Sequence, residues 1–223
     1  MKTAVDRLKQ LSLYAYLIRL QVLNSLAYRF EYFSSIGTNV FFLFGSVYLW
    51  KSAYKGISSV GQVAEEQMVT YAIVSVLMTA LFSINVNQNL FAKIRQGDIA
   101  VDFIRPANLL YFWLAEDLGL SLSAITRFCL PVLLVSALFV KVPLPADPLA
   151  GVLFLPSCVL SYLILWQLSA LIGLTAFWVI ELGNIGSIKD MIVLILSGRM
   201  VPLWLFPDIV QRLSAFLPFQ YTY

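Results

Sequence analysis

Residues 149–178 read LAGVLFLPSCVLSYLILWQLSALIGLTAFW and contain no charged side chain. A helix needs about 20 mostly apolar residues to cross the hydrocarbon core of a membrane, so this run is long enough to span it. The composition of the whole chain agrees. Of its 223 residues, 60% are hydrophobic and only 12% are charged, whereas about a quarter of an average soluble domain is charged. The sequence therefore predicts an all-α integral membrane protein.

Apolar runs of this kind recur along the chain. The first has Tyr32 and Phe33 at one end and Tyr48 and Trp50 at the other, which is typical of the aromatic belts at membrane–water interfaces. The last run is short. Five membrane-spanning helices are predicted, covering residues 32–50, 68–90, 112–140, 149–178 and 185–200.

The two ends of the chain have a different character. In residues 1–31 apolar side chains recur at helical spacing with basic residues between them, which predicts an amphipathic elbow helix in the headgroup plane. A charged lead-in to the first span is the alternative. Residues 201–223 are apolar but contain three prolines, which disrupt a helix interior. An outer re-entrant hairpin is predicted there, marked by Gly198, Pro202, Pro207 and Pro218.

The distribution of Lys and Arg predicts the orientation, because these residues are enriched in cytoplasmic loops. With the N-terminus inside, the inner segments hold Lys2, Arg7, Lys9, Arg19, Arg29, Lys93, Arg95, Arg105 and Lys189. The outer segments hold Lys51, Lys55, Lys141, Arg199 and Arg212. A cytoplasmic N-terminus is predicted. The net charge of +3 is small, so no nucleic-acid partner is expected.

The stretch AKIRQGDIAVDFIRPANLLYF, residues 92–112, is unusually charged for its setting between two spans. Gly97 is predicted to break the second helix and Asp98 to cap a new, short one. Pro106 ends this helix at or before Arg105. Its Phe103 and Ile104 share a face with Ala100. A short helix of this kind either docks on a partner or lies on the membrane interface, and the residue pattern leaves both readings open.

Little in the chain suggests its own chemistry. It contains no histidine, which excludes Ser-His and Cys-His pairs, zinc held by histidine and imidazole proton relays. It has no Walker A run for binding ATP. Glu116 and Asp117 are adjacent, so they point about 100° apart on a helix, and they are predicted to be a solvated start of the third span. Glu181 and Asp190 are predicted to be ordinary loop charges. An intramembrane enzyme is thus a weak alternative.

A secondary carrier or channel is the second alternative, because such proteins place ionisable groups inside their spans. Arg127 is the one candidate, and it is expected to reach the inner interface or to pair with Glu31 or Glu181. Uncharged amides offer another sign of a polar path. Asn85, Gln88 and Asn89 share a helix face at the end of the second span, where they could line a translocation path or a subunit interface. The other reading is that the helix has simply reached the headgroups.

Two stretches carry a resemblance to a known family. They are KIRQGDIAVDFIRPANLLYFWLAEDLG, residues 93–119, and LSGRMVPLWLFPDIVQRLSAFLPFQYTY, residues 196–223. The first resembles the cytoplasmic loop of type-2 ABC exporter permeases, in particular a bacterial branch with an Ile-Arg-x-Gly loop. The second is similar to the outer hairpin of that branch, with its Ser-Gly-x-x-x-Pro, Phe-Pro and Leu-Pro-Phe elements. The resemblance covers nearly the whole chain.

The resemblance implies a permease subunit of an ATP-driven exporter in the bacterial plasma membrane, with a sixth span expected beyond residue 223. It implies a cytoplasmic coupling helix that docks on a separate ATPase subunit, with two ATPase copies holding ATP and Mg²⁺. It also implies a second permease subunit, homologous or identical, and contact with membrane lipid. No cofactor is expected in this chain. The docking residues would be Arg95, Gly97, Asp98, Ile99, Asp102, Phe103, Ile104, Arg105 and Pro106.

Overall fold

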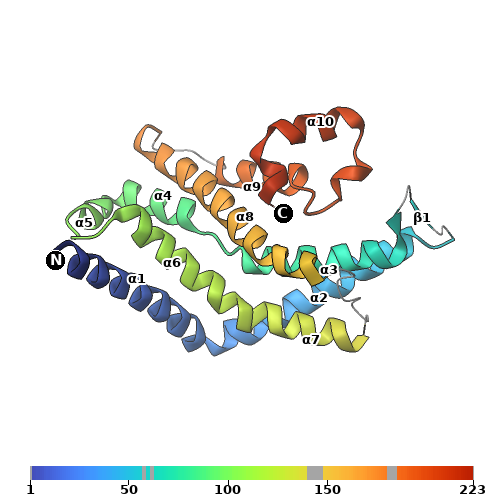
Figure 1. The fold of residues 1–223 in the computed structure, drawn as a ribbon, viewed down its shortest axis with the longest axis horizontal. Helices are drawn as coiled ribbons and strands as arrows, with labels where there is room; N and C mark the ends of the chain where they lie inside the picture. The colour runs from blue at the N-terminus through green and yellow to red at the C-terminus, as the bar shows by residue number, and fades with distance from the viewer. Residues whose placement is uncertain (1, 57–58, 61–62, 140–147, 180–184, 223) are drawn as a thin grey trace. The chain divides into compact units, whose positions relative to one another are not determined.

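The computed structural model describes residues 2–56, 59–60, 63–139, 148–179 and 185–222 (Figure 1). These residues are mostly helical and divide into two compact units. The first consists of Met1–Leu23, Ile84–Leu120 and Leu155–Tyr223, and the second of Asn24–Ser83 and Ser121–Phe154. The helical content agrees with the predicted all-α membrane protein.

Four helical segments among the described residues are long and apolar enough to cross a membrane, namely Tyr32–Ala53, Glu65–Gln96, Leu109–Phe139 and Pro148–Phe177. They correspond to the first four predicted spans. Many of their large apolar side chains are exposed in the isolated chain, among them Phe41, Phe42, Leu134 and Leu138. Faces of this kind need lipid or another apolar partner, which is the expected property of a multi-pass membrane protein.

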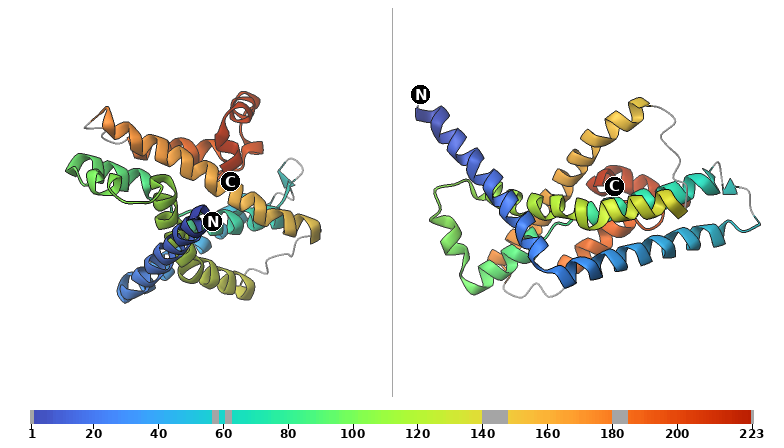
Figure 2. Two further views of the ribbon diagram at one scale, coloured as in Figure 1. Left: turned by 60° about the vertical axis from the view of Figure 1, so that its left-hand side comes forward. Right: turned by 90° about the horizontal axis from the view of Figure 1, so that it is seen from below.

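The second unit is built around two helices that run antiparallel, α2 (Arg29–Ala53) and α3 (Glu65–Leu81). They are joined at one end by a short hairpin, β1 (Ser59–Val60) with β2 (Val63–Ala64), as both views in Figure 2 allow the reader to follow. This hairpin was not predicted from the amino-acid pattern. The core of the unit consists of Leu43, Val47, Val69, Ile73 and Val132.

The second predicted span, residues 68–90, falls within a candidate span but is not one continuous helix. The helix α3 ends at Leu81, and a new helix, α4, covers Val86–Gln96. Between them Phe82 (φ −85°, ψ 54°) and Asn85 (φ −120°, ψ 4°) leave helical geometry. Ser and Asn side chains compete with helical hydrogen bonds, and the Ser83 hydroxyl indeed donates to the carbonyl of Ala80 at 2.9 Å. The polar residues therefore interrupt the helix.

The predicted third span is also irregular. It consists of α6 (Leu109–Ala124), a π-helical turn η1 (Ile125–Cys129) and α7 (Leu130–Phe139). Pro131 explains the change of winding, because proline has no N–H to donate and clashes with the carbonyl one turn earlier. Arg127 lies in the π-turn and donates to the Ser123 hydroxyl at 2.7 Å. Its predicted alternative partners, the side chain of Glu31 and Glu181, lie outside the described residues.

The fourth predicted span agrees with an observed helix, and the fifth stays a prediction. The helix α8 covers Pro148–Leu174 and continues into a 3₁₀ turn, η2 (Thr175–Phe177). By contrast, α9 (Ile185–Leu196) has 12 residues within the described part of the chain, which is about 18 Å of helix against a hydrocarbon core of about 30 Å. The described part of α9 is therefore shorter than a membrane-spanning helix.

Lys189 was counted with the basic residues of the inner segments, and its burial was not expected. It lies in α9 and is 7% exposed. Its ammonium donates to the Ser169 hydroxyl of α8 at 3.0 Å and pairs with Asp190 at 2.7 Å. A buried ammonium needs partners of this kind, and they allow the lysine to sit in an apolar helix. Asp190 itself is more than half exposed.

The C-terminal segment forms three short helices instead of one long one. They are η3 (Leu203–Leu205), α10 (Asp208–Phe216) and η4 (Pro218–Thr222). Pro202 and Pro207 stand directly before the first two, and Pro218 begins the third, as expected from the helix-starting role of proline. Gly198 follows α9 with a φ of +81°. At the other end of the chain, α1 covers Lys2–Ala27, and Tyr28 separates it from α2.

Candidate functional site

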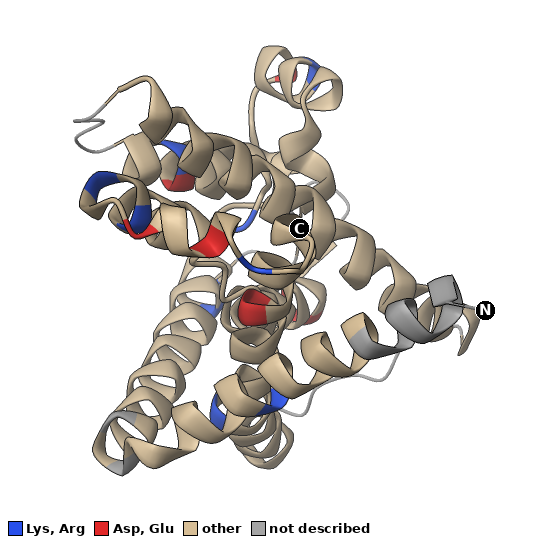
Figure 3. Ribbon diagram, turned by 90° about the vertical axis from the view of Figure 1, so that its left-hand side faces the viewer, with Lys and Arg blue, Asp and Glu red and all other residues tan. Residues whose placement is uncertain are grey.

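The charged stretch forms a compact corner of the first unit. It contains the end of α4, the short helix α5 (Ile99–Phe103) and the start of α6. Basic and acidic residues gather there, while long parts of the other helices carry no charge (Figure 3). Gly97 ends α4 with a φ of +83°, a left-handed conformation that glycine adopts without strain. This turn directs the chain from α4 into α5.

We expect Gly97→Ala to destabilise this corner by about 1–2 kcal/mol, because a residue with a Cβ is strained in the left-handed region. The cost would be purely conformational, since a Cβ at Gly97 meets nothing within 4 Å. The measurement is the apparent melting temperature of the purified protein in detergent. Gly45→Ala in α2 is the matched control, because its Cβ also meets nothing and alanine favours a helix. Equal stability of the two variants would show that the turn is not strained.

Asp98 does not cap α5 as predicted. Its backbone is already helical (φ −65°, ψ −16°), and its side chain makes no capping hydrogen bond. A capping side chain requires a non-helical backbone at the cap position. The turn is instead closed by backbone hydrogen bonds, from the Ala100 N–H to the Gly97 carbonyl and from the Val101 N–H to the Asp98 carbonyl. Asp98 thus stands at the N-cap position, as predicted, but the predicted cap by its carboxylate is wrong.

Asp102 anchors α5 to its neighbours. It is 2% exposed, and its Oδ2 accepts hydrogen bonds from Nζ of Lys93 at 2.9 Å and from Nε1 of Trp113 at 3.1 Å. Arg105 lies 3.5 Å from Oδ1 and its guanidinium stacks over the Phe112 ring, 4.4 Å from the centroid. One carboxylate thus ties together α4, α5 and α6, so Asp102 and Arg105 support α5 within the chain, and their predicted docking role stays a prediction.

These contacts keep Asp102 ionised. Burial alone would raise its pKa, but the hydrogen bonds from Lys93 and Trp113 lower it. The positive charges of Lys93 and Arg105 act in the same direction, and the pKa of Asp102 lies below its usual value. A buried carboxylate is tolerated only when it is paired and hydrogen-bonded in this way. The corner is therefore a rigid base for α5 at neutral pH.

The opposite face of α5 is open. Ile99 is buried together with Asp102, whereas Val101 is 52% exposed, Phe103 60% and Ile104 81%. Large apolar side chains fixed on a rigid, charged corner are costly to leave in water. The predicted sharing of a face by Phe103 and Ile104 agrees with this arrangement. The face is available to a partner or to the membrane surface.

Asp117 lies in α6, one helical turn after Trp113. It makes buried contacts that were not predicted from the sequence. It was predicted to be solvated, yet it is 1% exposed. Its carboxylate accepts hydrogen bonds from the N–H groups of Asn85 and Val86, at 3.2 and 3.0 Å, and from Nε1 of Trp166 at 3.0 Å. The interruption before α4 leaves backbone donors without helical partners. Asp117 satisfies two of them and connects α4, α6 and α8.

The signal that could have revealed this contact was the pairing of two unusual features. One is the polar run around Asn85 within an apolar span, and the other is a carboxylate beside it in the next span. A lone carboxylate in a spanning helix is expected to have a partner. Reading the two features separately assigned each to the headgroups, which is why the contact was missed.

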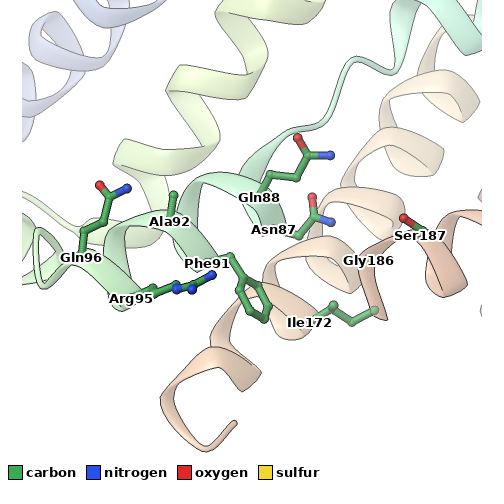
Figure 4. A pocket seen from close by; sticks show the side chains of 9 residues that line it. All are labelled: Asn87, Gln88, Phe91, Ala92, Arg95, Gln96, Ile172, Gly186 and Ser187. Carbon is green, nitrogen blue, oxygen red and sulfur yellow. The ribbon is translucent and has the colours of Figure 1, made fainter. Parts of the chain in front are cut away.

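A cleft of about 610 Å³ opens between α4, α8 and α9 (Figure 4). Its lining is Asn87, Gln88, Phe91, Ala92, Arg95, Gln96, Ile172, Gly186 and Ser187. The helices approach closely here because Gly173 of α8 has no side chain, and a Cβ at that position would lie 2.9 Å from Cα of Asn87. Figure 4 shows side chains of α4 directed toward the start of the described part of α9.

The three amide residues predicted to share one helix face lie in different surroundings in the structure. Gln88 lines the cleft, while Asn85 supplies the backbone donor to Asp117 and Asn89 lies away from the cleft lining. Asn87, which is not one of the three, is the deeply buried amide, 4% exposed, and lines the cleft. The shift arises because α4 begins only at Val86. Arg95, predicted to dock the ATPase, also lines the cleft.

Comparison with known protein families identifies the family of the chain. The family described as ABC-2 family transporter protein matches residues 40–223. This chain belongs to the ABC-2 transporter family. Comparisons with curated proteins and with solved structures each find no match.

Membership of the ABC-2 family establishes the kind of protein. The chain is a multi-pass membrane protein and a permease component of an ABC transporter, and such permeases are transport subunits that generally work with ABC ATPases. The resemblance drawn from the two stretches was therefore correct at the family level. Among the described residues of this ABC-2 protein, no group of three or more His, Cys, Asp or Glu could hold a metal.

Proposed function

We propose that this ABC-2 protein is the permease subunit of an ATP-driven exporter in the bacterial plasma membrane, where it forms half of the translocation path. The observation that carries the proposal is the open apolar face of α5, set on a corner that Asp102 holds rigid. Family membership supports the transport role, and the ATP-driven step belongs to a partner because the sequence has no Walker A run.

In this proposal α5 is the element that receives force from the ATPase. Val101, Phe103 and Ile104 insert into a groove of that subunit, and the buried contacts of Asp102 pass its motion to α4 and α6. A docking contact can transmit motion only if the helix that carries it is held rigidly to the rest of the protein. The paired, buried carboxylate of Asp102 holds α5 in this way. The other reading, in which α5 rests on lipid, predicts no effect of these side chains on the ATPase.

The proposed assembly contains two ATPase subunits, which hold ATP and Mg²⁺, and a second permease that is homologous or identical to this chain. The N-terminus and α5 are cytoplasmic in this arrangement, which is supported by the excess of Lys and Arg in the inner segments. The residues after α9 form the outer hairpin, with the prolines at its turns. Exposed apolar side chains on the spans are available for the contact with the second permease.

The direct test is affinity purification of the full chain from its native membranes in mild detergent. An ABC ATPase and a second permease subunit should be recovered in amounts comparable to the tagged chain. Substrate transport into inside-out vesicles should then require ATP. A secondary carrier would instead purify without an ATPase and would transport with an ion gradient alone, and that result would exclude the proposal.

A further inference from the structure

The cleft between α4, α8 and α9 has an unusual set of polar groups. Arg95 is the one ionisable residue among the described residues that line it. Its guanidinium forms no ion pair or hydrogen bond within the described part of the chain. This contrasts with Lys93 and Arg105 on the same corner, which both pair with Asp102. Among the described residues, nothing at the cleft compensates the positive charge of Arg95.

Asn87 adds an independent observation. Its side chain is 4% exposed, yet it makes no hydrogen bond to any described residue. A Cβ added at Gly186 would lie 3.1 Å from its Nδ2, so the amide is directed across the cleft toward α9 (Figure 4). The amide therefore faces the cleft with no hydrogen bond to a described residue, and a ligand that accepts hydrogen bonds can bind to it.

The remaining lining suits one chemical class. Gln88, Gln96 and Ser187 can donate further hydrogen bonds, and no carboxylate occurs among the described lining residues. A guanidinium flanked by amide and hydroxyl donors matches the oxygens of a phosphate group. Phe91 and Ile172 provide an apolar wall beside them. The volume of about 610 Å³ is within the range of pockets that hold small molecules and exceeds what a single anion needs.

The position of the cleft agrees with this chemistry. Arg95 and Gln96 are the last residues of one candidate span, and Ile172 lies near the end of another. The ends of spanning helices lie at the level of the lipid headgroups, where basic pockets between helices bind anionic lipids. We infer that this cleft binds a phosphate ester, either the headgroup of an anionic lipid or a soluble ester, held by Arg95 and the Asn87 amide. The inference does not depend on the exporter function or on the ATPase.

The test is a titration of the purified full chain with phosphatidylglycerol, followed by native mass spectrometry. Arg95→Gln should weaken binding at least about tenfold, since it removes a charge-assisted contact, and Arg95→Lys should restore part of it. Asn87→Asp is nearly isosteric, and its negative charge should weaken binding as well. Arg212→Gln in α10, away from the cleft, is the matched control and should change binding less than about twofold.

A second arm separates the two sources of phosphate. If soluble glycerol phosphate competes with the lipid at similar concentration, the natural ligand is a soluble phosphate ester. If it does not compete, the ligand is an anionic lipid. Either result supports a phosphate site as long as it depends on Arg95. Equal binding by the parent chain and Arg95→Gln, or an equal loss in Arg212→Gln, would overturn the inference.

Discussion

The Asp117→Ala variant is expected to yield little folded permease. Its carboxylate accepts hydrogen bonds from Val86 and Trp166, which are buried, and from the part-buried N–H of Asn85. An unsatisfied buried donor costs about 1–3 kcal/mol, so the two buried donors alone should cost at least about 2 kcal/mol, a large part of the 5–15 kcal/mol that stabilises a typical protein. The measurement is the monodisperse fraction in detergent and the apparent melting temperature.

Two variants serve as controls for this effect. Glu116→Ala removes the neighbouring carboxylate, which is 30% exposed and lies 3.8 Å from Lys93, and it should change stability by less than about 1 kcal/mol. Asp117→Asn keeps one acceptor oxygen and should be intermediate. If Asp117→Ala is as stable as Glu116→Ala, the break before α4 does not depend on this carboxylate.

The Phe103→Ala variant is expected to fold normally and to lose its ATPase. Phe103 is 60% exposed and makes no contribution to the Asp102 contacts, so its removal should not disturb the membrane part. Full burial of such a ring in a partner contributes about 1.5–3 kcal/mol, which corresponds to roughly a ten- to hundred-fold loss of affinity. The measurement is the amount of ATPase recovered per inserted permease, together with the ATPase rate stimulated by substrate.

The matched control is Phe216→Ala. Phe216 is 88% exposed on α10 and belongs to the predicted outer hairpin, so it should have no effect on ATPase recovery. Ile104→Ala should act like Phe103→Ala, because it shares the open face of α5. If Phe103→Ala retains both the ATPase and its stimulation, α5 rests on lipid, and the proposed route from ATP to the membrane part is incorrect.

Helix ends and long apolar spans could be predicted from the sequence, because they depend on the properties of single residues. Gly97 was expected to end a helix and does so with a positive φ, and Pro202 and Pro207 were expected to break the C-terminal segment and stand before its short helices. The fourth span was predicted almost to its ends because no charge or turn residue interrupts it. These outcomes depend on side-chain volume, backbone freedom and hydrophobicity, which are properties of single residues.

The predicted cap by Asp98 failed and the burial of Lys189 was not expected, because the environment of each residue depends on other parts of the chain. Asp98 carries the right side chain for a helix cap, but backbone hydrogen bonds of the turn hold it in helical geometry. Lys189 was counted with the basic residues of the inner segments, but Ser169 from another helix allows its burial. In each case the residue type is compatible with two environments, and a partner distant in sequence selects one of them.

The same division holds for the function. The long apolar runs and the charged stretch between two of them are enough to specify a membrane protein with a candidate docking helix, because hydrophobicity and helix-breaking residues act locally. Which side chains of that stretch support the helix and which remain open depended on the tertiary structure, since only there does Asp102 meet Lys93 and Trp113. The same is true of the cleft, where Asn87 and Arg95 of α4 lie across from Gly186, because separate helices have to pack before their side chains can form one site.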